Sequence, residues 1–171
     1  MLRAAVRPKG PMPAERVVAD RHRMRHREGW ESEGLRAGMK PKPRALRVVV
    51  ADDDDDMRAA MCELIAGLGV EVAAASSGGD LVRVLTDDLP VDLLITDVRM
   101  PWMTGYNVAR SARNSGLLIP IIIVTAFADD SLAAQVERLG SAVLLAKPFR
   151  PEELLSLVRS RLPATSSQAS S

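Results

Sequence analysis

The stretch VVVADDDDDMR, from Val48 to Arg58, joins a buried strand to a helix through a run of acidic residues. The strand comes first: Leu46–Ala51 is an apolar, β-branched run, which is typical of a strand covered on both faces in a parallel sheet. The helix follows, because Asp55–Leu68 has apolar residues at helical spacing, and Gly69 is expected to end it. The acidic run Asp52–Asp56 therefore lies at the carboxyl end of a buried strand.

The alternation of strand and helix continues along the chain. Further strands are predicted at Glu71–Ala75, Leu93–Thr96, Pro120–Thr125 and Ala142–Leu145, and further helices at Gly78–Asp88, Gly105–Asn114, Asp130–Leu139 and Pro151–Leu162. Five strand–helix units in succession predict a doubly wound α/β fold, a (βα)5 flavodoxin-like three-layer sandwich around a parallel five-stranded sheet in the order 2-1-3-4-5. Ligands bind such a sheet beyond the carboxyl ends of strands 1 and 3, where the winding reverses.

The composition indicates one folded domain between two tails. Of the 171 residues 47% are hydrophobic but only 3% aromatic, so the core must be aliphatic. Residues 1–45 contain twelve Lys and Arg against five Asp and Glu, a net charge of +7 that leaves −6 for the remainder. This proline-punctuated segment lacks apolar periodicity. We therefore expect a disordered basic leader at 1–44, a domain at 45–162 and a disordered Ser-rich tail at 163–171.

Three interpretations of the basic leader remain open. A solvated tail is the plainest one. The run Arg21–Arg27, in which arginine alternates with histidine, also suggests an arm that binds nucleic acid, although Trp30 is its only aromatic residue. Alternatively the native chain starts at Met39, which leads directly into the first strand. We expect that nucleic acid is not a partner.

The sequence predicts a cytoplasmic protein. Cys62 is the only cysteine, so an internal disulfide is impossible. No stretch reaches the ~18 apolar residues of a membrane span. The N-terminus has no apolar block of the kind that a secretory signal needs.

Polar side chains follow several of the predicted strands. Asp52 and Asp53 come after the first strand, Asp97 after the third, Thr125 ends the fourth and Lys147 follows the fifth. Crowded carboxylates attract a hard cation such as Mg²⁺, which takes oxygen ligands and keeps several waters. With a lysine and a hydroxyl nearby, one carboxylate can attack phosphorus and hold it as an acyl phosphate. The sequence thus predicts a phosphoryl-acceptor site.

Four motifs in this order resemble the receiver domains of two-component response regulators, in particular stand-alone, chemotaxis-regulator-like ones. They are VVVADDDDDMR (48–58), DLLITDVRMPWMTG (92–105), IIIVTA (121–126) and KPF (147–149). The similarity extends over residues 44–162, which is all of the chain that we expect to fold. Each motif alone is modest evidence, but four in order, each at a predicted strand end, are specific.

The resemblance implies a metal site. Asp53 is then a direct Mg²⁺ ligand, and Asp52 contributes mainly through water. Asp97 is also a ligand, and the backbone carbonyl of Arg99 supplies the third protein oxygen.

The resemblance also implies the roles of the phosphoryl-binding residues. Asp97 is the phosphoacceptor. Thr125 donates a hydrogen bond to a phosphoryl oxygen, with the Ala126 amide nearby. Lys147 pairs with the acceptor carboxylate and then with the phosphate, and the Lys147–Pro148 peptide bond is cis.

The chain departs from the family pattern at one position. Receiver domains often carry Tyr or Phe three residues before the lysine, and here this position is Leu144. The aromatic half of the usual switch is therefore absent. Two bulky side chains, Arg99 and Phe127, follow the acceptor and the threonine by two residues each.

The function implied by the resemblance is a phosphorylation-controlled protein-interaction switch. A histidine kinase or phosphotransfer protein donates the phosphoryl group, and a downstream protein partner contacts the last two strands and helices; a homodimer is an option. The domain is an acceptor that phosphorylates and dephosphorylates itself, not a conventional enzyme. Two alternatives remain: a receiver-like scaffold that binds partners without switching, and a regulator that binds nucleic acid through its leader.

Overall fold

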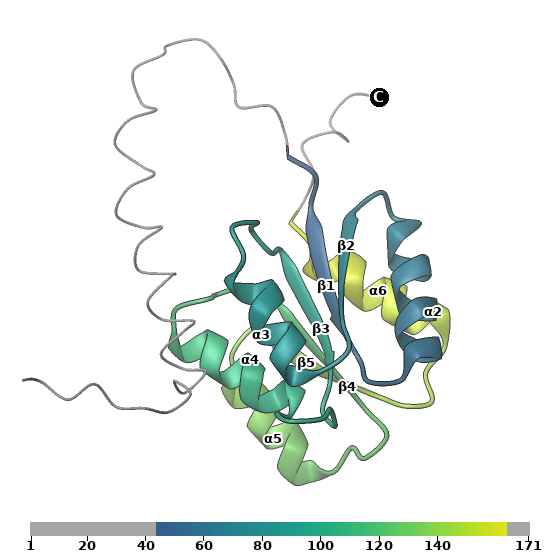
Figure 1. Cartoon of the computed structure of the whole chain (residues 1–171). Helices are drawn as coiled ribbons and strands as arrows, with labels where there is room; N and C mark the ends of the chain where they lie inside the picture. The colour runs from purple at the N-terminus through teal and green to yellow at the C-terminus, as the bar shows by residue number, and fades with distance from the viewer. Residues whose placement is uncertain (1–43, 164–171) are drawn as a thin grey trace, which may run out of the picture.

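The computed structural model describes residues 44–163. Strands and helices alternate throughout this part of the chain (Figure 1). The strands are β1 (Arg47–Ala51), β2 (Glu71–Ala75), β3 (Leu93–Asp97), β4 (Ile121–Thr125) and β5 (Ala142–Ala146). The helices are α2 (Asp55–Ala66), α3 (Gly78–Thr86), α4 (Gly105–Asn114), α5 (Asp130–Arg138) and α6 (Pro151–Arg161).

The strands form one parallel sheet in the order β2-β1-β3-β4-β5, as the sequence predicts. Helices α2 and α6 cover one face, and α3, α4 and α5 cover the other (Figure 1). The α/β doubly wound three-layer fold is therefore confirmed. Right-handed crossovers place the winding reversal between β1 and β3, which opens a crevice at their carboxyl ends.

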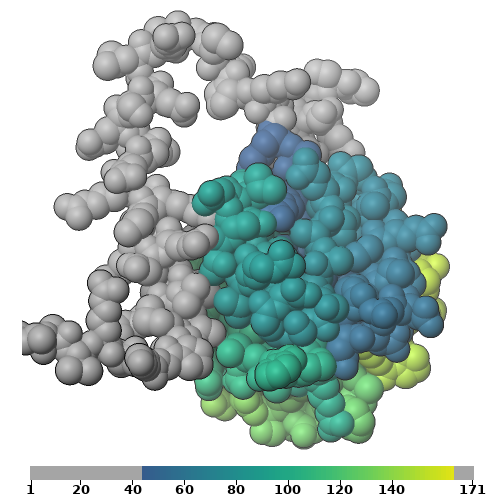
Figure 2. Space-filling model, viewed as in Figure 1, coloured from purple at the N-terminus to yellow at the C-terminus, as the bar shows by residue number. Residues whose placement is uncertain are grey.

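Two aliphatic clusters fill the space between the layers. Alternate residues of β1 point to opposite faces, so Val48 and Val50 pack with α2 and α6 while Val49 and Ala51 pack with α3 and α4. Every residue of β1, β3 and β4 is buried, whereas the edge strand β5 is half-buried. On the face of the sheet that α3 and α4 cover, the side chains form a continuous surface (Figure 2).

Two helices end two residues earlier than predicted. Helix α2 ends at Ala66, because Gly67 caps it and the next two amides turn back to Ile65 and Ala66 instead of continuing the helix. Helix α3 ends at Thr86, because the backbone of Asp87 is extended and its carboxylate binds Arg47. The remaining boundaries agree within one residue.

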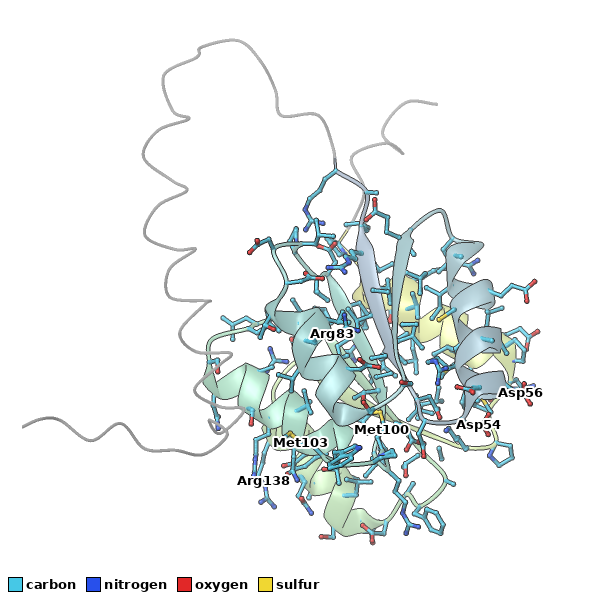
Figure 3. All side chains as sticks on the ribbon, viewed as in Figure 1. Asp54, Asp56, Arg83, Met100, Met103 and Arg138 are labelled. Carbon is cyan, nitrogen blue, oxygen red and sulfur yellow. The ribbon has the colours of Figure 1, made fainter. Side chains whose placement is uncertain are left out.

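The helices on the carboxyl side of the sheet start with side-chain caps. Asp54, Ser77, Thr104 and Asp129 each accept a hydrogen bond from a backbone N–H of the first turn. Asp54 and Asp56 lie at the start of α2, at the same end of the molecule as Met100 and Met103 of the loop after β3 (Figure 3). The caps thus fix several loops around the crevice.

Arginines fasten the opposite end, where the strands begin. Arg47, the first residue of β1, forms a two-pronged contact of 3.0 Å with Asp87, and Arg44 pairs with Asp92. Arg113 at the end of α4 donates three hydrogen bonds of 2.8 Å, to the carbonyls of Leu117, Ile119 and Gly140. The loops that enter β4 and β5 are thereby tied to α4.

Parts of two expected segments lie outside the described residues. The leader predicted at 1–44 and the tail predicted at 163–171 have only residues 44 and 163 within the range that the structure covers. Their predicted disorder therefore stays a prediction, as does the arm at Arg21–Arg27. Among residues 44–163, no helix is both long and apolar enough to cross a membrane.

Candidate functional site

An open pocket of about 470 Å³ lies at the carboxyl edge of the sheet. Its lining residues are Asp52, Asp53, Asp54, Asp97, Arg99, Thr125, Ala126, Phe127 and Lys147. The structure thus brings to one place all six residues that the sequence nominated. They come from the ends of β1, β3, β4 and β5, because parallel strands deliver their carboxyl ends to one edge.

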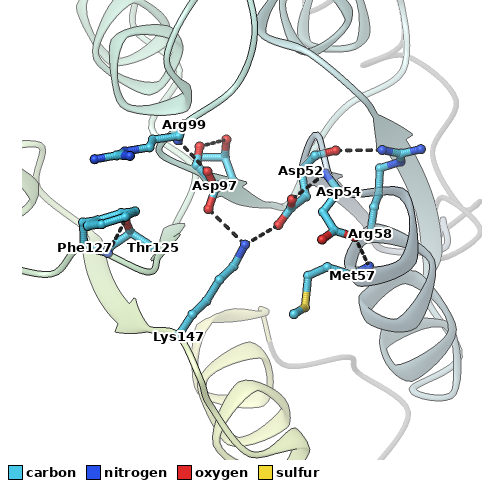
Figure 4. A network of polar contacts seen from close by, with 10 residues as sticks. Asp52, Asp54, Met57, Arg58, Asp97, Arg99, Thr125, Phe127 and Lys147 are labelled. Carbon is cyan, nitrogen blue, oxygen red and sulfur yellow. Dashed lines mark hydrogen bonds and ion pairs between the residues drawn. The ribbon is translucent and has the colours of Figure 1, made fainter.

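Lys147 lies between two carboxylates (Figure 4). Its Nζ is 2.7 Å from Asp52 Oδ2 and 3.0 Å from Asp97 Oδ1. The Asp52 side chain is 1% exposed, and that of Lys147 is 18% exposed. One ammonium group therefore shares its positive charge between two buried carboxylates.

Burial and the contacts between Lys147 and the two acids act in opposite directions on the pKa values of Lys147 and Asp97. Burial alone would lower the pKa of Lys147, but hydrogen bonds and charge from Asp52 and Asp97 raise it overall. Burial raises the pKa of Asp97, and the Asp52 charge adds to the rise, against lowering contributions from Lys147 and the Arg99 amide. The pKa of Asp97 is raised overall because the effect of burial is the largest and exceeds the lowering by Lys147 and the Arg99 amide.

Backbone donors orient the two buried carboxylates. The Arg99 amide donates to Asp97 Oδ2 at 2.5 Å, so both oxygens of Asp97 have a partner. The Asp54 amide donates to Asp52 Oδ1 at 3.0 Å, and Arg58 Nη1 donates to the Asp52 carbonyl at 2.8 Å. These contacts hold the acids at the rim in defined rotamers.

Thr125 faces the pocket from the end of β4. Its side chain is almost fully buried, and Oγ1 accepts a hydrogen bond of 3.1 Å from the Phe127 amide. The hydroxyl proton is not used in that bond, so it is available to an oxygen in the pocket.

Asp53 stands apart from the other two predicted metal ligands. Its residue is exposed and lines the pocket, whereas Asp52 and Asp97 are buried and bridged by Lys147. Within residues 44–163, no three His, Cys, Asp or Glu side chains are clustered closely enough to form a metal cage. The metal-ligand roles predicted for Asp52, Asp53 and Asp97 therefore stay predictions.

The donor chemistry nevertheless fits Mg²⁺. This ion keeps several waters and is commonly bound through one or two carboxylates, so it needs no closed protein cage. Asp52, Asp53 and Asp97 offer such oxygens on one wall of an open pocket. If the ion is bound, it would neutralise charge on a phosphoryl group in the pocket.

Two contacts at the site have no direct signal in the sequence. The Arg99 guanidinium carbon lies 3.6 Å from the centroid of the Phe127 ring. Arg58, one turn into α2, reaches back to the Asp52 carbonyl. Both partners of the first contact stood out as bulky neighbours, but only the fold brings residues 99 and 127 together.

The loop after β5 has the predicted backbone form. The Lys147–Pro148 peptide bond is cis. Leu144, at the position where an aromatic residue is common, is half-buried and packs against the core under α3, α4 and α5.

Comparison with known proteins shows the family of the chain. The family model for the response regulator receiver domain matches residues 48–159. Response regulator TodT of Pseudomonas putida is 33% identical over 127 residues, which cover 74% of this chain and 56% of TodT. Response regulator MprA of Mycobacterium ulcerans is 35% identical over 123 residues, covering 71% and 52%. The chain thus spans about half the length of these relatives.

Solved structures give the same result. The chemotaxis protein CheY4 of Vibrio cholerae superposes with a TM-score of 0.63 at 26% identity, over 70% of this chain and all of that one. A putative response regulator from Chloroflexus aurantiacus superposes with a TM-score of 0.62 at 33% identity, over 68% and 97%. With the family match and the strand order in agreement, the chain belongs to the response regulator receiver domains of two-component systems.

Proposed function

We propose that this receiver domain accepts a phosphoryl group on Asp97, with Mg²⁺ bound, and thereby switches its affinity for a downstream protein. The phosphoryl donor is the phosphohistidine of a histidine kinase or phosphotransfer protein. The observation that carries the proposal is the position of the Asp97 carboxylate, buried at the pocket floor with Lys147 on one oxygen and the Arg99 amide on the other.

The transfer follows from these contacts. An Asp97 oxygen attacks phosphorus, an O–P bond forms, the N–P bond of phosphohistidine breaks, and the electron pair stays on the imidazole nitrogen. Lys147 moves from the carboxylate toward the phosphoryl oxygens, and the Thr125 hydroxyl donates to one of them. Hydrolysis reverses the modification: water attacks phosphorus and the Asp97 carboxylate leaves.

Metal binding is part of the proposal. Asp53 would hold Mg²⁺ directly, Asp52 would act mainly through water, and Asp97 and the Arg99 carbonyl would supply the other protein oxygens. Asp53 suits a direct ligand, since it is exposed to the pocket and Lys147 does not occupy it. Asp52 suits a water-mediated one, since Lys147 already occupies its Oδ2.

We place the receiver unit at 45–162, with a leader at 1–44 and a tail at 163–171. We infer a cytoplasmic signalling protein that acts as a phosphoryl acceptor, not as a conventional enzyme. Its output surface is the face of β4, β5, α5 and α6, through which a protein partner or a second copy would bind.

Phosphoramidate tests acceptance without knowledge of the kinase, because it presents a phosphoryl group on nitrogen. The full chain is incubated with phosphoramidate and Mg²⁺, and its intact mass is measured. We expect one added phosphoryl group, which hydroxylamine removes because it is an acyl phosphate. Asp97→Asn should add none, and Asp130→Asn, an exposed acid outside the pocket, should behave as the wild type.

Two outcomes would contradict the proposal. A wild-type chain that stays unmodified under these conditions would favour the scaffold that binds partners without switching. A hydroxylamine-resistant modification would place the phosphoryl group on a hydroxyl instead of Asp97.

A further inference from the structure

Two cations line the pocket, and they are engaged very differently. Lys147 contacts the carboxylates of Asp52 and Asp97. The side chain of Arg99 runs away from Asp97 and lies over the ring of Phe127 (Figure 4), with 3.6 Å between the guanidinium carbon and the ring centroid. No carboxylate among residues 44–163 forms a salt bridge with Arg99.

The Arg99 guanidinium is therefore a positive charge in the same pocket as the acceptor that forms no salt bridge with residues 44–163. The backbone of residue 99 is already attached to Asp97 through the amide that donates to Oδ2. Because both side chains line the same pocket, the guanidinium can reach the space above Asp97 by rotation of its own side chain. Phe127 is 59% exposed, so its ring does not lock the arginine in the core.

A phosphoryl group changes the balance of forces on Arg99. It brings up to two negative charges into a pocket where the other basic side chain among the described lining residues, Lys147, is shared between two acids. The planar guanidinium fork matches phosphoryl oxygens and forms charge-assisted hydrogen bonds with them. Such bonds are stronger than a cation–π contact at an exposed ring.

We propose that Arg99 is a second phosphoryl-binding cation, held on the Phe127 ring until Asp97 is modified and then transferred to the phosphoryl oxygens. This inference rests on the proposed function. Phe127 sets how readily Arg99 is released, so it is a positioning residue that competes with the phosphoryl group.

Release of Arg99 also uncovers the Phe127 ring. The Phe127 amide donates to Thr125 Oγ1, so the ring and the hydroxyl belong to one connected unit. When Arg99 leaves, the loop at residues 126–129 loses its contact with the guanidinium, while the Phe127 amide still donates to the Thr125 hydroxyl that donates to the phosphoryl group. This loop lies directly before α5 and supplies a route to the output face that does not use an aromatic residue at Leu144.

Binding of beryllofluoride, a phosphoryl mimic, in the presence of Mg²⁺ tests the proposal in a double-mutant cycle. We compare the wild type, Arg99→Met, Phe127→Leu and the double variant by titration. Methionine keeps length and removes charge, and the backbone contacts of residue 99 survive. We expect about tenfold weaker binding for Arg99→Met. We expect two- to fivefold tighter binding for Phe127→Leu, because the competitor for Arg99 is gone.

The sign of the Phe127 effect is decisive. In the Arg99→Met background, Phe127→Leu should change nothing, because no guanidinium remains to release. Weaker or unchanged binding for Phe127→Leu alone would overturn the competition, and Arg99→Met binding as tightly as the wild type would overturn the phosphate role. If Phe127 instead acted as a simple cover, its effect would persist in both backgrounds, which also contradicts the proposal.

A second readout follows the ring itself. The chain contains two phenylalanines, Phe127 and Phe149, so a chain with 4-fluorophenylalanine gives two ¹⁹F signals, assigned with Phe127→Leu. The Phe127 signal should move when beryllofluoride binds, and in Arg99→Met it should start near the bound position. A wild-type chain that binds no beryllofluoride would defeat the proposed function together with this inference. Normal binding with an unmoved Phe127 signal would defeat the inference alone.

Discussion

Lys147 and Asp52, 95 residues apart in the chain, form an ion pair of 2.7 Å that is almost removed from water. This pair, and not the longer one to Asp97, is the tighter contact of the lysine. It gives Lys147 a structural role in addition to its proposed role in phosphoryl transfer, and the two roles can be separated by experiment.

Lys147→Met should lower the free energy of unfolding at pH 7 by about 3 kcal/mol, because Asp52 would keep its buried charge without a counter-ion. The raised pKa of Lys147 fixes the pH dependence. The lysine contributes fully below its unfolded pKa of about 10.5, and its contribution is lost as the pH rises through the higher folded value. Urea unfolding between pH 7 and pH 11 measures this.

The control for the lysine is Arg150→Met, which breaks an exposed ion pair with Glu153. It should cost less than about 0.5 kcal/mol at any pH. Equal losses for the two variants would show that the Lys147–Asp52 pair carries no particular stability.

Asp97→Asn should stabilise the fold at neutral pH. The raised pKa of Asp97 means that folding disfavours its ionised form, so removal of the charge relieves a cost. The gain should be complete above the folded pKa of Asp97 and should disappear as the pH falls to the unfolded value near 3.8, where the wild-type side chain is also neutral. A gain of about 1 kcal/mol would appear as a rise in Tm of ~4–8 °C.

Asp53→Asn is the matched variant, an exposed acid in the same pocket. Its effect on Tm should be smaller, because Asp53 is exposed and replacing it with asparagine removes no buried charge. A lower Tm for Asp97→Asn would mean that the carboxylate is a net support of the fold.

Gly105→Ala should disturb the loop that carries the acceptor. A Cβ at residue 105 would lie 2.0 Å from the Asp97 carbonyl oxygen and 2.1 Å from Thr96 Oγ1, closer than atoms can approach. We expect a loss of about 3 kcal/mol in unfolding free energy and weaker binding of the phosphoryl mimic. Thermal unfolding and a beryllofluoride titration measure the two effects.

Gly79→Ala supplies the comparison, because it lies in the first turn of α3 and its Cβ would approach only Ser77 Oγ, at 3.9 Å. Alanine favours helix there, so stability should rise by about 0.5 kcal/mol. If both alanine variants behave alike, the close packing at Gly105 is not what positions Asp97.

Thr125→Ala should slow phosphoryl acceptance about tenfold, because one hydrogen bond to the transferred group is lost. It also leaves the Phe127 amide without its acceptor. Thr125→Ser keeps the hydroxyl and should retain the rate within a few-fold. The rate of mass gain with phosphoramidate distinguishes them, and equal rates for the alanine and serine variants would remove Thr125 from the mechanism.

The order of the sheet could be predicted because each strand is an uninterrupted apolar run and crossover handedness restricts the arrangement. The same logic placed Asp52, Asp97 and Lys147 at one edge. The ends of α2 and α3 could not be predicted to the residue, because Gly67 and the Asp87–Arg47 contact end them through tertiary structure.

The finer arrangement of the pocket also depends on tertiary structure. Lys147 contacts both Asp52 and Asp97 because Asp52 is buried beside it. The burial of Asp52 cannot be predicted from the sequence. The contact of Arg99 with Phe127 joins loops that follow different strands, so the spacing of residues along the chain does not predict it.

The arginines at the amino ends of the strands have a mechanical consequence. Arg113 holds three carbonyls before β4 and β5, and Arg44 and Arg47 hold the start of β1 to Asp92 and Asp87. The loops at that end of the sandwich are thus tied to one another by side chains, and the pocket with Asp97 lies at the opposite end. Among the loops, amide hydrogen exchange should therefore be slower at the arginine-held amino ends of the strands than at the carboxyl ends, so a change in conformation after modification of Asp97 is expected in the loops at the carboxyl ends.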